Sequence, residues 1–170
     1  LMTDLEKTLF QAKLSDSANR PQKTFDLMRI IVENKKTELS AEERTLFANS
    51  YKHIISSIRA SANKIIEIYN EEEKKKSPHL SLIKTLKENI EKELKTACLL
   101  MLDLLDKYLI KNATTVDTKV LYQKLKGDYF RYLATYFPGS EYSQSAMMAY
   151  SQGTVFSETL SCINPIKIDL

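Results

Sequence analysis

The chain contains very few residues that break helices. Only three glycines and four prolines occur among its 170 residues, too few for the hairpins of a β-sandwich or barrel. Between the prolines, apolar residues recur at intervals of three and four, with almost no β-type alternation. This spacing places apolar side chains on one face of a helix. The sequence therefore predicts an all-α fold, an antiparallel bundle of helices joined by short loops.

Turn residues and caps predict where these helices begin and end. Ser40 and Glu43 have the spacing of a capping box, and Ser77-Pro78 is typical of a second helix start. The six expected helices cover about residues 4–18, 24–34, 40–72, 77–110, 115–136 and 140–161. Asn164-Pro165 opens a seventh very close to Leu170. We therefore expect residues 1–170 to form a single domain that lacks its C-terminal helices.

Composition and charge exclude several classes of protein. The longest apolar run, Ala97 to Leu102, is too short to span a bilayer. Cys98 and Cys162 are too few for a disulfide framework, which fits a reducing compartment. The formal net charge is only +3, and acidic residues are spread throughout the chain. We expect a cytoplasmic protein with neither a membrane nor a nucleic acid as partner.

Motifs for catalysis or metal binding are missing from the sequence. His53 and His79 are the only histidines, and neither has a second ligand at metal-binding spacing. The glycines form no phosphate loop, and no serine lies in a nucleophile elbow. The expectation is a protein that is not an enzyme, with no catalytic residue, metal or cofactor.

Two pairs of basic residues have matching spacing. Lys52 and Arg59 are separated by two helical turns in one predicted helix, and Lys124 and Arg131 repeat that spacing in another. If the two helices face a common groove, positive charge would gather at one place, and a phosphate dianion would satisfy it. The alternative is an ordinary solvent face, since 25 lysines and arginines produce such pairs by chance.

Two further residues accompany the second basic pair. Asp128 precedes Arg131 by three residues, close enough on a helix surface to orient the guanidinium. Tyr132 follows Arg131 and could donate a hydrogen bond to a phosphate, or could equally be a tyrosine of the core or its rim.

Several stretches of the sequence resemble the 14-3-3 proteins. The segments Glu42-Glu43-Arg44, Tyr51-Lys52 and Arg59-Ala60-Ser61 are similar to the third helix of that family. The run from Lys124 to Ala134, KLKGDYFRYLA, is similar to its fifth helix almost residue for residue. Leu104 to Ile110 and Lys119-Val120 resemble the lead-in to that helix, and Pro165-Ile166-Lys167 resembles the start of the seventh. The resemblance covers essentially the whole chain.

The resemblance implies a fold and a binding site. Members of the family are all-α proteins of nine helices that dimerise and bind phosphoserine or phosphothreonine peptides in an amphipathic groove. By resemblance, the phosphate pocket maps to Lys52, Arg59, Arg131 and Tyr132, and Lys124 lies along the same groove. Ser56, Ile58 and Ala62 depart from the family's third helix. The apolar wall of the groove comes mostly from the seventh and ninth helices, which this sequence does not contain.

The residues that the resemblance assigns to the dimer interface are only partly kept. They are Leu14, Ala18, Arg20, Leu86 and Glu93. Arg20 and Glu93 align with one salt bridge between subunits of the family. A second bridge is lost, because Lys23 or Thr24 stands in place of an acid and Asn89 in place of a lysine. We expect a homodimer with an altered or weakened interface.

The sequence therefore favours an adaptor that has no catalytic activity and binds phosphorylated client proteins. The alternative is a helical scaffold protein whose groove binds partners without phosphate dependence. Comparing phosphorylated with unmodified clients separates the two, because a scaffold would bind both alike.

Overall fold

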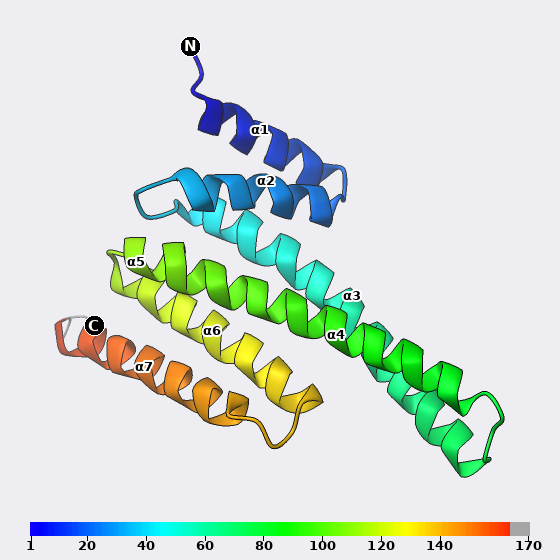
Figure 1. Cartoon of the computed structure of the whole chain (residues 1–170). Coiled ribbons are helices and arrows are strands. Elements are labelled where there is room, and N and C mark those ends of the chain that lie inside the picture. The colour runs from blue at the N-terminus through cyan, green and yellow to red at the C-terminus, as the bar shows by residue number, and fades with distance from the viewer. Residues whose placement is uncertain (164–170) are drawn as a thin grey trace, which may run out of the picture. The chain divides into compact units, whose positions relative to one another are not determined.

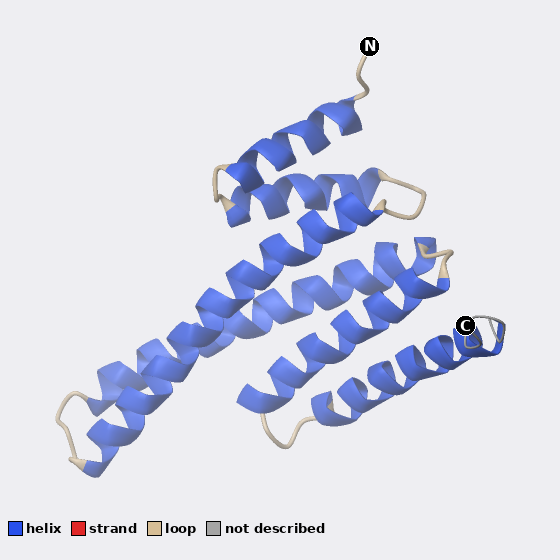
Figure 2. Ribbon diagram, turned by 180° about the vertical axis from the view of Figure 1, so that it is seen from behind, coloured by secondary structure: helices blue, strands red, loops and turns tan. Residues whose placement is uncertain are grey.

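The part of the protein that the structure describes consists of helices joined by short loops (Figures 1 and 2). The computed structural model describes the backbone of residues 1–163 and the side chains of residues 1–159. The helices are α1 (Asp4–Ser17), α2 (Pro21–Asn34), α3 (Ala41–Lys74), α4 (Leu80–Leu104), α5 (Ile110–Asn112), α6 (Val116–Tyr136) and α7 (Tyr142–Ile163), with a π-helical segment at Leu105–Leu109. No strand occurs among these residues, which confirms the predicted all-α fold. The seventh helix expected at Asn164-Pro165 lies outside the described residues.

The chain forms two compact units. The first consists of residues 1–31 and 40–97, and the second of residues 32–39 and 98–170. The boundaries fall inside α2 and α4, so both helices contribute to each unit. Within the described range, no helix combines the length and apolar character that crossing a membrane requires.

The first unit begins its helices with strong caps. Thr3 opens α1 and Ser40 opens α3, each in a capping box whose partner is Glu6 or Glu43. The Ser40 amide donates to the Glu43 carboxylate at 2.7 Å, and the Glu43 amide donates to Ser40 Oγ at 3.2 Å. The capping box predicted for Ser40 is therefore confirmed.

Aromatic side chains fill the core of the first unit. The ring of Phe25 lies 5.5 Å from that of Phe47 and 4.2 Å from that of Tyr51, measured between centroids. All three side chains are buried. The Tyr51 hydroxyl donates to the carbonyl oxygen of Ala97 at 2.6 Å, so the polar end of this ring is satisfied inside the core. This contact fixes α3 against α4.

In the second unit, α6 and α7 run antiparallel and side by side (Figure 1). The buried side chains of this unit come from the end of α4, the π-helical segment, α6 and α7, with others from residues 32–39, and include Met101, Leu105, Tyr122, Leu133 and Ala149. The unit also contains residues 32–39, which lead from the end of α2 toward α3.

One carboxylate ties that connection to the start of α6. Glu38 accepts hydrogen bonds from the hydroxyls of Thr114 at 2.6 Å, Thr115 at 2.8 Å and Thr118 at 2.6 Å, and from the amides of Thr114 and Thr115. Partial burial raises the pKa of Glu38, but these donors outweigh it, so the pKa lies well below its ordinary value. Glu38 therefore stays ionised and supports the N-terminus of α6, where Thr115 is the N-cap.

Two helices begin three residues away from the predicted start. Helix α2 begins at Pro21 rather than at residue 24, since proline fits the first position of a helix. The helix expected from residue 77 begins at Leu80 instead. Ser77 is the first residue of a tight turn before this helix, in which the Leu80 amide donates to the Ser77 carbonyl at 3.3 Å.

The predicted continuous helix over residues 77–110 is interrupted near its end. The Ile110 amide donates to the carbonyl of Leu105, five residues earlier, which gives the segment Leu105–Leu109 its π-helical turn. Leu105 and Leu109 are both buried there. The extra residue in this turn shifts the apolar periodicity, a local change that intervals of three and four do not reveal.

Candidate functional site

The first basic pair lies at the edge of the buried face of α3. Tyr51 and Ile55 are buried, whereas Lys52 is exposed and Arg59 is half-buried. At 100° per residue, Lys52 and Arg59 fall within about 20° of each other around the helix axis. Both side chains therefore leave α3 in one direction, as the seven-residue spacing predicts.

The second basic pair belongs to a group of polar side chains on α6 and α7. We call this group the α6 cluster; its members are Lys124, Asp128, Arg131, Tyr132 and, from α7, Tyr150. The Tyr150 hydroxyl donates to Asp128 Oδ1 at 2.6 Å. Lys124 Nζ lies 3.6 Å from Asp128 Oδ2, and Arg131 Nη2 lies 3.9 Å from Asp128 Oδ1. The carboxylate of Asp128 is thus the common neighbour of two cations and one phenol.

Arg131 presents its guanidinium to solvent. Its side chain is 54% exposed, although its Cζ lies over the Tyr132 ring, 4.9 Å from the centroid. The Tyr132 ring also meets Tyr129 edge-on at 5.6 Å, and Tyr129 is buried. The aromatic surface therefore supports the guanidinium from one side, as cations are held on ring faces. Its 3.9 Å ion pair with Asp128 is too long for a hydrogen bond, so much of its donor capacity remains available.

Tyr150 is the member of the α6 cluster that sequence analysis did not identify. Its ring lies against Gly127, and a Cβ atom at residue 127 would stand 2.4 Å from Tyr150 Cε1. Only glycine permits this approach of α7 to α6. A glycine inside a long helical pattern, immediately before Asp128, was the available signal that another backbone or side chain comes close.

Burial and hydrogen bonding within the α6 cluster keep both the Tyr150 phenol and the Arg131 guanidinium protonated. Burial raises the pKa of Tyr150, and its bond to Asp128 raises it further, so the phenol keeps its proton. Hydrogen bonding with Tyr150 raises the pKa of Arg131 above its ordinary value. The cluster thus holds a permanent cation and a neutral phenol that donates to the acid.

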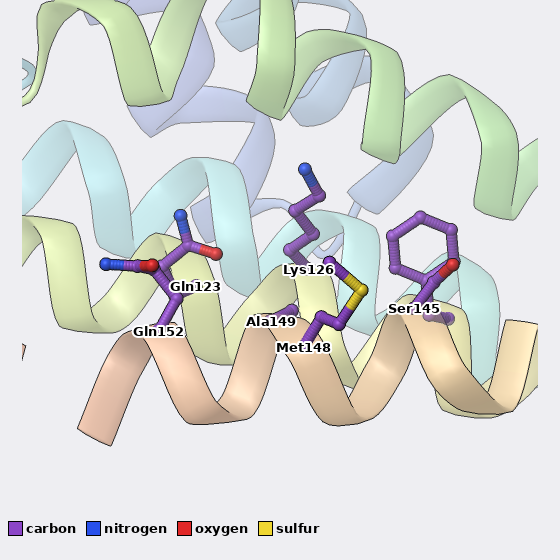
Figure 3. A pocket seen from close by; sticks show the side chains of 7 residues that line it. Gln123, Lys126, Ser145, Met148, Ala149 and Gln152 are labelled. Carbon is purple, nitrogen blue, oxygen red and sulfur yellow. The ribbon is translucent and has the colours of Figure 1, made fainter. Parts of the chain in front are cut away.

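Two pockets lie along the contact of α6 with α7. One has a volume of about 330 Å³ and is lined by Gln123, Lys126, Phe130, Ser145, Met148, Ala149 and Gln152 (Figure 3). Its lysine is engaged, because Lys126 Nζ lies 2.8 Å from Asp106 Oδ1. The other pocket, of about 340 Å³, is lined by Lys124 and Tyr150 among others. Only this second pocket adjoins the α6 cluster.

Sequence analysis assigned four residues to the phosphate, Lys124 to its groove and Asp128 to orienting Arg131; the structure brings four of these six together. Lys124, Asp128, Arg131 and Tyr132 are neighbours in the second unit. Lys52 and Arg59 belong to the first unit. No group of three or more His, Cys, Asp or Glu side chains within the described residues could hold a metal ion.

The residues expected at a dimer interface all lie in the first unit. Leu14 and Ala18 are at the end of α1, Arg20 is in the turn before α2, and Leu86 and Glu93 are on α4. All five are exposed, and the apolar Leu14 and Leu86 are 55% and 51% exposed. Phe10, which sequence analysis did not single out, is also 57% exposed, one turn before Leu14 on α1.

Comparison with known proteins gives the same family along nearly the whole chain. A family model described as "14-3-3 protein" matches residues 11–170. The chain is 37% identical over 172 residues to the 14-3-3-like protein D of Nicotiana tabacum, covering 97% of this chain and 69% of the relative. It is 36% identical to the 14-3-3 protein epsilon of Drosophila melanogaster, covering 99% of this chain and 66% of the relative. The 14-3-3 protein theta of Homo sapiens is 37% identical, with coverage of 98% and 69%.

Proposed function

Because this chain belongs to the 14-3-3 family, we propose that it is an adaptor that binds phosphoserine or phosphothreonine in client proteins. The observation that carries the proposal is the exposed guanidinium of Arg131, which lies over the Tyr132 ring and shares the carboxylate of Asp128 with Lys124. Such an adaptor acts by occupancy, because it masks or clamps a phosphorylated segment and catalyses nothing.

The chemistry of these side chains matches a phosphate dianion. A guanidinium grips phosphate through two parallel hydrogen bonds, and a lysine or a tyrosine hydroxyl adds a single donor. Each bond to the charged group contributes on the order of 1.5–3 kcal/mol. An unmodified serine offers neither the charge nor the acceptor oxygens, so it would form none of these bonds to a charged group.

The proposed pocket includes the basic pair of α3. We assign Lys52, Arg59, Arg131 and Tyr132 to one phosphate, with Lys124 farther along the same groove. The family match supports this assignment, since it runs over residues 11–170 and so includes both basic pairs. The matching orientation of Lys52 and Arg59 on α3 supports it as well.

Fluorescence anisotropy with a labelled Arg-Ser-x-pSer-x-Pro peptide tests the proposal. We expect binding of the phosphorylated peptide, no comparable binding of the unmodified peptide, and loss of binding in an Arg59→Ala, Arg131→Ala double variant. Lys7→Ala serves as a matched control, because Lys7 is an exposed cation of α1 outside the proposed pocket. Equal binding of both peptides would instead support a scaffold that does not depend on phosphate.

We further propose that the chain forms a homodimer through α1 and α4. Exposed apolar side chains on these helices, Phe10, Leu14 and Leu86, support an interface there. Two linked grooves would raise the avidity for clients that carry two phosphorylated sites. Lys23 and Asn89 cannot form the second salt bridge that the family has between its subunits, so this interface is weaker than that of the family.

A further inference from the structure

The acid and the guanidinium of the α6 cluster are connected through one hydroxyl. Asp128 and Arg131 stand one turn apart on α6, but their charged groups are 3.9 Å apart at Asp128 Oδ1 and Arg131 Nη2. The Tyr150 hydroxyl, which comes from α7, lies 2.6 Å from the same Oδ1. Hydrogen bonding with this hydroxyl also affects Arg131, whose pKa it raises.

We propose that Tyr150 is a positioning residue through which Asp128 orients Arg131 toward a bound phosphate. This inference rests on the proposed function and goes beyond it, because it names a residue outside the pocket that sets the phosphate affinity. In this arrangement the Tyr150 hydroxyl donates a hydrogen bond to Asp128 Oδ1, the carboxylate oxygen that also lies nearest to Arg131 Nη2. Asp128 therefore orients the guanidinium without neutralising it through a direct bidentate pair.

The packing of the phenol suits this role. The side chain of Tyr150 is half-buried, and Gly127 lets its ring lie directly on α6. Three charged groups face the hydroxyl or its acceptor: Asp128, Arg131 and Lys124, whose Nζ is 3.6 Å from Asp128 Oδ2. A hydroxyl fixed in this way has one donor and two acceptor lone pairs, enough to serve both neighbours.

Binding of the labelled phosphopeptide to a Tyr150→Phe variant is the first test. We expect its dissociation constant to rise about 5- to 10-fold, as loss of a hydrogen bond to a charged group predicts. Tyr142→Phe is the matched control, because Tyr142 lies on the same helix, is also half-buried, and stacks on Phe130 at 6.4 Å. This control should bind like the unaltered chain.

A double-mutant cycle separates positioning from independent structural effects. Asp128→Asn should weaken phosphopeptide binding about as much as Tyr150→Phe. The double variant should bind no more weakly than either single variant, because both substitutions break the same link from Asp128 through Tyr150 to Arg131. If the two losses multiply, or if Tyr150→Phe binds like the control, the proposal is overturned. Thermal unfolding of each variant shows whether it is folded at the temperature of the assay.

A second measurement works without any ligand. With ¹³C-labelled tyrosine rings, the NMR titration of Tyr150, assigned from its absence in Tyr150→Phe, should show a pKa that falls in Asp128→Asn. The side-chain NεH of Arg131 should exchange faster in Tyr150→Phe than in Tyr142→Phe. If the unaltered chain binds no phosphopeptide, the proposed function fails and the ligand role of Tyr150 fails with it. An unchanged titration and exchange rate would instead refute the linkage itself.

Discussion

At the scale of single residues, Glu38 illustrates how one side chain can hold two distant segments. Its carboxylate accepts from three threonine hydroxyls and two amides at the start of α6. Since the pKa of Glu38 in the folded protein lies well below its ordinary value, ionised Glu38 stabilises the fold at neutral pH. That contribution is lost as pH falls below the ordinary glutamate pKa of about 4.3 toward the lowered value.

We therefore expect Glu38→Gln to lower the free energy of unfolding by about 1–3 kcal/mol at pH 7, because a neutral amide accepts these bonds more weakly. Urea denaturation at pH 7 and at pH 3 measures the effect, and the difference from the unaltered chain should shrink at the lower pH. Glu141→Gln, at an exposed position before α7, is the control and should change little. A difference that is the same at both pH values would contradict the role of the ionised carboxylate.

The residues of the candidate site, together with Glu38, show which features can be predicted from sequence and which cannot. Lys52, Arg59, Lys124 and Arg131 could be identified because helical spacing within one segment relates each pair. Glu38 and Tyr150 could not, since their partners are 76 to 80 and 22 residues away in sequence. Such contacts depend on how helices pack, which the periodicity of a single segment does not specify.

At the scale of elements, the contact of α6 with α7 depends on two glycines with different surroundings. A Cβ atom at Gly127 would stand 2.4 Å from Tyr150 Cε1, whereas one at Gly153 would have Gln123 Cβ as its nearest neighbour at 3.4 Å. The first distance requires the Tyr150 ring to move, and the second is an ordinary van der Waals contact. Alanine substitutions at the two positions therefore test whether steric overlap or helix propensity has the larger effect on the free energy of unfolding.

We expect Gly127→Ala to destabilise the protein by about 1–3 kcal/mol, because the added methyl group overpacks the contact between the helices. Gly153→Ala should be neutral or stabilising by up to about 1 kcal/mol, since alanine is the better helix former. Thermal unfolding of the two variants side by side checks both expectations. Equal effects of the two substitutions on stability would show that the packing of the Tyr150 ring against α6 does not require glycine at residue 127.

Local signals explain why most helix boundaries were predictable. The capping box of Ser40 and Glu43 uses residues three apart, so it is visible in the sequence and is present in the structure. The π-helical turn at Leu105–Leu109 has no comparable signature. It keeps Leu105 and Leu109 buried, and this tertiary requirement overrides the regular α-helical period.

At the scale of the whole molecule, the proposed dimer depends on the exposed faces of α1 and α4. The apolar residues Phe10, Leu14 and Leu86 supply surface that association would remove from water. Charge complementarity is incomplete, because Lys23 and Asn89 are both exposed and offer no opposite charges to each other. Apolar contact would then provide the affinity, and the lost ion pair would reduce its strength.

We therefore expect the combined substitutions Lys23→Asp and Asn89→Lys to tighten the homodimer. A twofold interface would gain two ion pairs, each contributing about 0.2–1 kcal/mol when exposed, so the dissociation constant should fall roughly 2- to 30-fold. Sedimentation equilibrium at micromolar concentration measures this, and the gain should diminish in 1 M NaCl because salt screens exposed charges. Lys23→Asp alone is the matched control, since it introduces an acid without its cation. A gain as large in that single variant, or no gain in the pair, would mean that these two positions do not face each other across the interface.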